Sequence, residues 1–383
     1  MIGAQTQPAA ALGLYVHFPW CVRKCPYCDF NSHPLRGALQ EPQYLEVLLD
    51  DLAQEAERHG NRAIASVFLG GGTPSLFSPE AMRALLSAPV VAGALEVTME
   101  ANPGAVEHGS FRAYRKAGVT RVSLGAQSFD PAQLQTLGRI HSPEETDAAL
   151  AEVRGAGFTS FNIDLMHGLP GQTEADALAD LERAIRHDPP HISWYQLTIE
   201  PKTEFARRPP AGLPDSDAAA DMEAAGVALL ERHGYRRYEV SAFARPGHEC
   251  RHNINYWRFG DYLGIGAGAH GKHTSFGGDG KAAVLRTAKP SQPRLYLADH
   301  CAATTPVASE ELAFEFLLNA LRLTDGAEWE LFSARTGLSR TTIEPTVSEL
   351  IAWGLMRSDR IALTPEGRVQ LDAVVSRFLK PLR

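Results

Sequence analysis

Residues 14–30 read LYVHFPWCVRKCPYCDF, and this stretch decides the fold. It holds three of the five cysteines of the chain: Cys21, Cys25 and Cys28. They follow the short apolar run 14–18, which reads as a strand. Pro19 precedes the cysteines and Pro26 lies among them. Because proline removes a backbone donor and clashes with the preceding helical turn, we predict a loop rather than a helix. Such a loop can bring three thiolates around one centre.

Thiolates bind soft partners such as zinc or iron-sulfur clusters. A structural zinc needs four protein ligands, and no fourth cysteine is near. His17 and His33 are the side chains that would complete a zinc site. Three buried cysteines without a metal are the other alternative to a cluster. A [4Fe-4S] cluster held by three cysteines leaves one iron open to a small ligand.

The Cys-x3-Cys-x2-Cys spacing resembles the loop of the radical S-adenosylmethionine (SAM) proteins, in which the open iron holds the amino and carboxylate groups of SAM. Over residues 15–30 the chain is similar to the branch that contains oxygen-independent coproporphyrinogen III oxidases and related heme chaperones. The oxidases carry a further cysteine two residues after the third ligand. This chain has Phe30 there, as the chaperones have an aromatic residue. The resemblance implies that the three cysteines hold a [4Fe-4S] cluster.

The composition indicates a globular protein with one large domain and a smaller one. The chain has 383 residues, of which 44% are hydrophobic and 21% are charged. A net charge of −8 offers no basic surface for nucleic acid. We find neither a secretory signal nor an apolar run of about 18 residues that would form a transmembrane segment. Clustered cysteines suit a reducing compartment, so we expect a cytoplasmic protein, with peripheral membrane association left open.

Short apolar runs alternate with helical periodicity over the first 240 residues. The predicted strands are 14–18, 66–69, 96–101, 121–126, 160–166 and 192–199. The predicted helices are 44–58, 79–86, 110–117, 144–156, 174–187 and 218–233. This alternation predicts an α/β fold with a parallel sheet that is closed or partly closed as a barrel. The resemblance specifies this fold as a partial parallel (β/α)6 barrel of the radical-SAM kind. In such barrels the functional residues lie at the carboxyl ends of the strands.

Unusual residues follow the predicted strands at those ends. Glycines 70–72 after the second run let a ligand approach the backbone, although a triple glycine is also a common turn. Glu100 at the end of the third run could bind an ammonium or a ribose hydroxyl. The resemblance implies the following SAM contacts: Tyr15, Gly71, Gly72, Thr73, Glu100, Gln127, Arg139 and Asp164. Leu197 and Thr198 are weaker candidates, and His167 is either a pocket residue or part of a loop.

Residues 252–257 read HNINYW, which corresponds to a motif of the heme-chaperone members. Imidazole is a common axial ligand of heme iron, and the resemblance makes His252 the first candidate. The competing interpretation is that His252 forms a local hydrogen bond and the aromatic residues belong to the core. Other candidate ligands lie nearby: His248, His270, His273 and Cys250. The glycine-rich run 264–271 allows either close approach to a flat ligand or a bulged strand.

The last part of the chain is mainly helical. Helical segments are predicted at 310–322, 329–333, 342–353 and 365–379, with a short strand at 360–363. This order suggests a winged-helix-like domain, as members of the branch carry. Residues 301–383 hold nine Lys and Arg against eleven Asp and Glu, so packing or partner docking is favoured over DNA binding. We predict three parts: a radical-SAM partial barrel (1–240), a barrel extension with the HNINYW motif (241–300) and the C-terminal domain (301–383).

Two functions follow from the resemblance. The first is a heme chaperone that binds heme and delivers it to acceptor hemoproteins such as respiratory enzymes. It would carry a [4Fe-4S] cluster and SAM, lack coproporphyrinogen oxidase activity and form a homodimer. The second is an oxygen-independent coproporphyrinogen III oxidase that decarboxylates propionate side chains through SAM-derived radicals. Phe30, the HNINYW motif and the only 13 residues before the first strand favour the chaperone.

Overall fold

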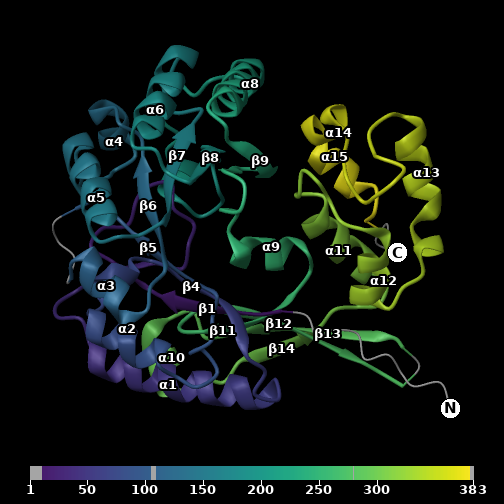
Figure 1. Ribbon diagram of the computed structural model, residues 1–383, viewed down its shortest axis with the longest axis horizontal. Coiled ribbons are helices and arrows are strands. Elements are labelled where there is room, and N and C mark those ends of the chain that lie inside the picture. Colours follow the sequence, from purple (N-terminus) through teal and green to yellow (C-terminus); the bar gives the residue numbers. More distant parts are fainter. Residues whose placement is uncertain (1–10, 105–108, 279, 380–383) are drawn as a thin grey trace.

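The computed structural model describes residues 11–104, 109–278 and 280–379. Its main feature is a 12-stranded sheet, whose strand order is β14-β13-β12-β11-β1-β4-β5-β6-β7-β8-β10-β9 (Figure 1). The strands from β11 to β8 are parallel: β11 (Asp261–Ile265), β1 (Leu12–Phe18), β4 (Ile64–Gly71), β5 (Glu96–Ala101), β6 (Arg121–Gln127), β7 (Ser160–His167) and β8 (His191–Gln196). Antiparallel strands extend both sides: β12 (His270–Phe276), β13 (Ala282–Ala288), β14 (Ala303–Pro306), β10 (Ala242–Ala244) and β9 (Arg236–Glu239).

The six predicted strands all lie in the parallel part of this sheet. Because β14 and β9 are its two ends, the sheet forms a partial rather than a closed barrel, as predicted. One parallel neighbour of β1 was not predicted: β11, which comes from residues 261–265. This short stretch, DYLGI, overlaps the start of the glycine-rich run 264–271, and only pairing with β1 establishes it as a strand. The boundaries predicted at residues 240 and 300 stay predictions.

Helices cover the outer face of the parallel strands (Figure 1). They are α1 (Glu41–Arg58), α2 (Pro79–Leu86), α3 (Phe111–Ala117), α4 (Pro131–Thr136), α5 (Pro143–Gly155), α6 (Glu174–Arg186) and α8 (Ser216–Arg232). The short helix α7 (Glu204–Arg207) precedes α8 in the chain. The starts of α5 and α6 are fixed by capping boxes at Ser142 and Thr173. A left-handed glycine, Gly118, ends α3.

Alternate residues of each strand point to opposite faces. Leu14, Val67 and Met99 belong to the apolar core shared with the covering helices. The positions between them carry polar side chains, such as Tyr15 and Glu100, which the curved sheet encloses. The fold therefore places apolar packing outside the barrel wall and polar chemistry inside it.

Helix α9 (Arg251–Trp257) lies at the amino-terminal ends of the parallel strands. Glu96, the first residue of β5, accepts hydrogen bonds from the backbone N–H groups of Arg251 and His252, both at 3.2 Å. A carboxylate at a helix N-terminus compensates the unpaired amides and the helix dipole. This contact fixes α9 at the end of the barrel opposite to the cysteine loop, which leaves the carboxyl end of β1.

The C-terminal part builds most of a second apolar core beside the barrel, to which Phe259 and Val284 also belong (Figure 1). Its helices are α11 (Leu312–Ala320), α12 (Trp329–Thr336), α13 (Glu344–Ala352), α14 (Pro365–Val369) and α15 (Leu371–Ser376), and α10 (Pro293–Ala298) precedes them. The prediction of one helix over 365–379 was wrong. The backbone leaves the helical region at Gln370 (φ −109°, ψ 24°), and the turn lets Val374 and Val375 reach the core. Strand bridges Ala327–Ile361 and Met356–Leu363 supply the predicted wing.

Within the described residues, the structure has no helix whose length and apolarity would let it cross a membrane.

Candidate functional site

The cysteine loop is closed at its base by two short strands. β2 (Trp20–Cys21) pairs with β3 (His33–Pro34), so the residues between them project as a loop from the end of β1. Lys24 donates hydrogen bonds from Nζ to the carbonyls of Phe30 (2.9 Å) and Ser32 (3.2 Å). Pro26 packs against Gly138, whose missing Cβ would lie 2.6 Å from the Pro26 ring. The loop is thus held at its base, across its turn and against the segment that precedes Arg139.

The three loop cysteines are free thiols and partly exposed. Burial raises the pKa of Cys21 and of Cys28, and in each case a neighbouring thiol of the loop adds to the rise. Arg139 donates from Nη1 to Cys25 Sγ at 3.7 Å, which places a cation beside the thiols. Three accessible thiols with an adjacent cation fit a cluster held by cysteine alone.

The zinc alternative does not fit this geometry. Among the described residues, no three His, Cys, Asp or Glu side chains are placed to hold one metal ion. His17 is buried and uses both ring nitrogens in hydrogen bonds. In a [4Fe-4S] cluster, by contrast, each thiolate binds a different iron, so the three sulfurs need not converge on one point.

His17 links Tyr15 to the far end of the cysteine loop. Its Nε2–H donates to the Asn31 carbonyl at 2.8 Å, and this fixes Nδ1 as the acceptor of the Tyr15 hydroxyl at 3.0 Å. Burial lowers the pKa of His17, which agrees with a neutral ring. Asn31 in turn donates from Nδ2 to the carbonyls of Ala267 (2.9 Å) and Ser291 (2.8 Å). The predicted SAM contact Tyr15 and the cysteine loop therefore belong to one hydrogen-bonded unit.

Glycines at the end of β4 and after β11 make room for this unit. A Cβ on Gly71 (φ +107°) would lie 2.5 Å from the His17 ring, and one on Gly72 would lie 2.4 Å from the Trp20 carbonyl oxygen. A Cβ on Gly268 would lie 2.2 Å from Asn31 Nδ2. The glycine run 264–271 thus admits part of the chain itself, where the sequence suggested a flat ligand or a bulged strand. SAM contacts at Gly71 and Gly72 stay predictions.

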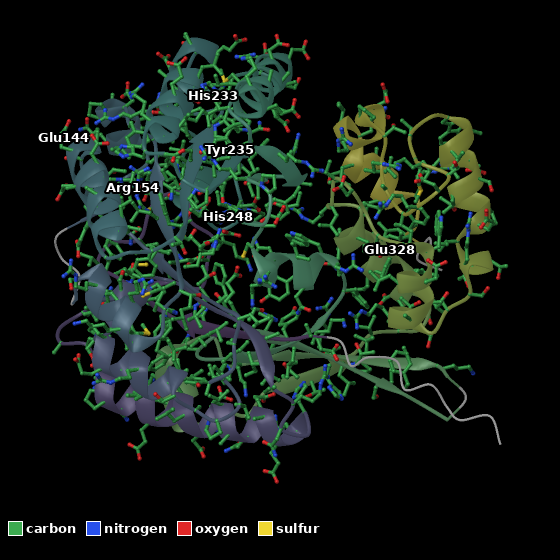
Figure 2. The ribbon with its side chains drawn as sticks, in the orientation of Figure 1. Glu144, Arg154, His233, Tyr235, His248 and Glu328 are labelled. Carbon is green, nitrogen blue, oxygen red and sulfur yellow. The ribbon has the colours of Figure 1, made fainter. Side chains whose placement is uncertain are left out.

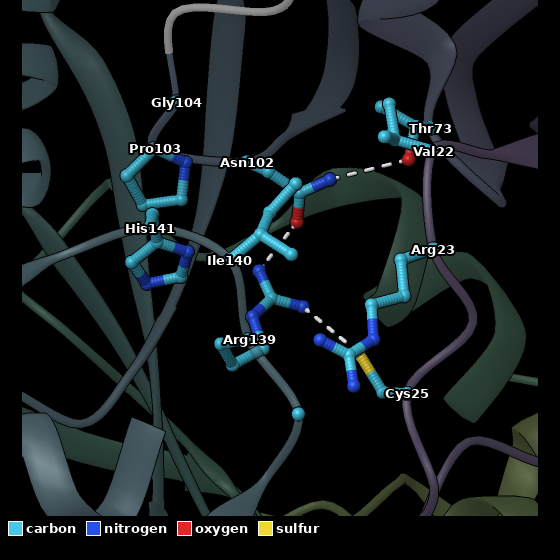
Figure 3. A pocket seen from close by; sticks show the side chains of 11 residues that line it. Val22, Arg23, Cys25, Thr73, Asn102, Pro103, Gly104, Arg139, Ile140 and His141 are labelled. Atoms are coloured by element: carbon cyan, nitrogen blue, oxygen red, sulfur yellow. Dashed lines mark hydrogen bonds between the residues drawn. The ribbon is translucent and has the colours of Figure 1, made fainter. Parts of the chain in front are cut away.

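Arg139 and Thr73 line a pocket next to Cys25 (Figure 3). Asn102 connects them: it accepts a hydrogen bond from Arg139 Nη2 at 2.5 Å and donates from Nδ2 to Thr73 Oγ1 at 3.2 Å. The remaining lining residues are Val22, Arg23, Pro103, Gly104, Gly138, Ile140 and His141. The pocket lies where a small ligand could touch both the cysteine loop and the strand ends.

Two buried carboxyl groups, those of Glu100 and Asp164, lie near each other inside the barrel. Glu100 accepts a hydrogen bond from the Gly71 amide at 3.1 Å, and burial together with nearby Asp164 raises the pKa of Glu100 to about 8. Burial also raises the pKa of Asp164, which accepts hydrogen bonds from Ser123 (3.0 Å) and Asn162 (2.7 Å). Buried carboxyl groups of this kind are suited to a cationic ligand, which restores their charge.

Gln127 ends β6 with a left-handed backbone (φ +67°), a conformation that often marks functional positions. Its Oε1 accepts a hydrogen bond from the Tyr195 hydroxyl at 2.6 Å. Of the weaker candidates, Leu197 is buried in a small apolar cluster and Thr198 is exposed. His167 packs on Trp194, with ring centroids 4.3 Å apart, and does not line the pocket.

His252 does not line the pocket that contains Cys25, Thr73 and Arg139. His252 is 1% exposed, and its Nδ1 shares a hydrogen bond with the Ser66 hydroxyl (3.1 Å) and its Nε2 with the Tyr256 hydroxyl (2.8 Å). Burial lowers the pKa of His252 to about 3, so the ring is neutral. His248, before α9, is partly exposed (Figure 2). Heme ligation by His252 stays a prediction, and it requires the ring to exchange one of these hydrogen bonds for iron.

Sequence reasoning missed Asn31, Asn102 and Tyr195. Asn102 stands two residues after Glu100 at the end of a strand, and this position could have identified it as a site residue. Asn31 and Tyr195 offered none, because their partners are remote in sequence.

Comparison with known proteins agrees with this geometry. The sequence profile of the Radical SAM superfamily matches residues 15–184, and that of the HemN C-terminal domain matches residues 307–369. The coproporphyrinogen III oxidase HemN from Escherichia coli, a radical SAM enzyme, has a similar solved structure. Its TM-score is 0.80 at 23% identity, over 99% of this chain and 92% of that chain, which establishes the shared fold.

Closer relatives are heme chaperones. The heme chaperone HemW of Haemophilus influenzae is 44% identical over 96% of this chain and 98% of its own length. The heme chaperone HemW of Escherichia coli is 48% identical over the same shares of the two chains. The chain therefore belongs to the HemW family within the radical SAM superfamily.

Proposed function

We propose that the protein is a heme chaperone that binds heme and delivers it to acceptor hemoproteins. The observation that carries this proposal is the 48% identity to a heme chaperone over 96% of the chain. Phe30 supports it, because this residue stands where the related oxidases have a further cysteine. Phe30 is 58% exposed, so no packing demand of the fold explains the aromatic side chain.

In this proposal Cys21, Cys25 and Cys28 hold a [4Fe-4S] cluster, and SAM binds across the neighbouring strand ends. A bound cluster supplies an electron and an open iron that chelates the amino acid part of SAM. Arg139 would hold the SAM carboxylate while it also donates to Cys25 Sγ. The Glu100 and Asp164 carboxyl groups would face the cationic part of SAM, whose positive charge favours their ionised forms. Tyr15, Gly71, Gly72, Thr73 and Gln127 complete the proposed set.

The second candidate function is oxygen-independent coproporphyrinogen III oxidase. It is supported by one observation, namely that Arg139, a SAM contact implied by the resemblance, lies against Cys25 of the cysteine loop. The proposed absence of oxidase activity rests on the resemblance to chaperones. The acceptor hemoproteins, the homodimer and the cytoplasmic location also stay predictions.

The deciding experiment is an anaerobic assay of the cluster-reconstituted protein with SAM, dithionite and coproporphyrinogen III. A heme titration and transfer of bound heme to an apo-hemoprotein are followed in parallel. The chaperone proposal expects tight heme binding and transfer without protoporphyrinogen formation. Catalytic turnover would establish the oxidase instead.

A further inference from the structure

His141 lines the pocket beside Arg139 and has an unused hydrogen-bond acceptor (Figure 3). Its Nε2–H donates to the Ala126 carbonyl at 3.1 Å, which leaves the lone pair of the neutral ring on Nδ1. That Nδ1 atom is buried and has no hydrogen-bond partner among the described residues. A buried acceptor without a donor is destabilising, so an orphaned one at a ligand pocket points to a ligand.

The ring is neutral as well as buried. His141 is 5% exposed, and burial together with the adjacent Arg139 cation lowers its pKa to about 4. At neutral pH the ring therefore does not carry the second proton that would occupy Nδ1. The lone pair is available to a donor without any change of protonation.

The backbone around His141 is held on both sides. The Arg139 amide donates to the Leu134 carbonyl at 2.9 Å, and the Ser142 amide donates to Glu145 Oε2 at 2.8 Å in the capping box of α5. The ring itself is fixed by its bond to Ala126. His141 is thus presented by rigid neighbours, as a binding residue needs to be.

We propose that His141 is a further ligand-binding residue of this pocket, and that its Nδ1 accepts a hydrogen bond from an N–H or O–H group of SAM. This inference rests on the proposed SAM site. Two parts of SAM can supply the donor: the ammonium of the amino acid part, or the amine and hydroxyl groups of the adenosine part. Both share the same chemistry, a donor facing a neutral imidazole.

Two substitutions separate the two nitrogens. In His141→Asn the side-chain oxygen can take the place of Nδ1, whereas in His141→Gln the amide N–H can take the place of Nε2–H and keep the bond to Ala126. We expect His141→Ala and His141→Gln to weaken SAM binding about tenfold, and His141→Asn to stay close to wild type. The melting temperatures of the cluster-free variants should show the opposite order. His141→Gln should melt at a higher temperature than His141→Asn, because it keeps the bond to Ala126.

The measurement is SAM affinity of the reconstituted protein by equilibrium dialysis, beside the melting temperature of each variant. His59→Ala is the matched control, because His59 is also buried with one unpartnered nitrogen but does not line the pocket. Binding of 5′-methylthioadenosine identifies the donor: a similar loss with this compound assigns the adenosine part, and a loss with SAM alone assigns the ammonium.

Equal SAM affinity in wild type, Ala and Gln variants would overturn the assignment of His141, as would an affinity order that follows the melting temperatures. If the reconstituted wild type itself failed to bind SAM, the proposed SAM site would be wrong, which is a different result.

Discussion

The His17 ring occupies the space that a side chain at Gly71 would need: its Cε1 lies 2.5 Å from the position of a Cβ on Gly71. The imidazole at the end of β1 therefore packs directly on the backbone at the end of β4. Since His17 also bonds to Tyr15 and Asn31, this contact joins the glycine motif to the cysteine loop.

Gly71→Ala should destabilise the cluster-free protein by about 2 kcal/mol or more, because the new methyl group clashes with His17 and the backbone φ is +107°. Urea unfolding measures this effect. Gly93→Ala is the control, since no atom lies within 4 Å of its Cβ position and its φ is not left-handed. Equal effects of the two substitutions would show that the packing of His17 on Gly71 is not as described.

Cys25→Ser should abolish cluster assembly, because a hydroxyl is a poor ligand for the soft iron-sulfur core. Iron content and visible absorbance after anaerobic reconstitution report the result. Cys301→Ser, at an exposed cysteine outside the loop, should reconstitute as the wild type does. An intact iron-sulfur spectrum in Cys25→Ser would refute the ligand assignment.

Glu100 should make the cluster-free protein less stable as pH rises. Its pKa is about 8 in the fold and 4.5 in the unfolded chain, so between these values unfolding releases a proton. The stability that protonated Glu100 contributes to the fold is fully present below pH 4.5 and is lost as pH rises toward 8. The free energy of unfolding falls by up to about 1.4 kcal/mol per pH unit over this range. Glu100→Gln removes this dependence and should gain stability relative to wild type from pH 5 to pH 8. Glu80→Gln, at an exposed position, is the control and should leave the pH dependence of stability unchanged. If wild type and Glu100→Gln lost stability in parallel as pH rises, the raised pKa of Glu100 would be contradicted.

His252→Ala should lower heme affinity while the cluster is retained, if His252 is the heme ligand. Because Tyr256 holds Nε2 at 2.8 Å, Tyr256→Phe should free that nitrogen and leave heme affinity equal or higher. Heme titrations of the three proteins measure both effects. An unchanged titration in His252→Ala would remove the residue from the heme site, and His248 would then be the next residue to test.

The local sequence was sufficient for the elements of the barrel and for the cysteine loop. Strand and helix periodicity depends on neighbouring residues, and the prolines at 19 and 26 exclude a helix without reference to the rest of the chain. The same local signals failed at residue 370, where a helix breaks so that its second half can reach the core. They also failed at β11, a short stretch that only its pairing with β1 establishes as a strand.

By itself, the sequence determined the alternating α/β architecture, the three-cysteine loop and the position of Glu100 near the end of a strand. The tertiary structure alone decided which side chains meet. It brought Asn31 to Ala267 and Asn102 to Arg139, left the Nδ1 of His141 without a partner, and placed His252 at the opposite end of the barrel. The physical reason is that periodicity is a property of adjacent residues, whereas hydrogen bonding and burial depend on groups that only folding brings together.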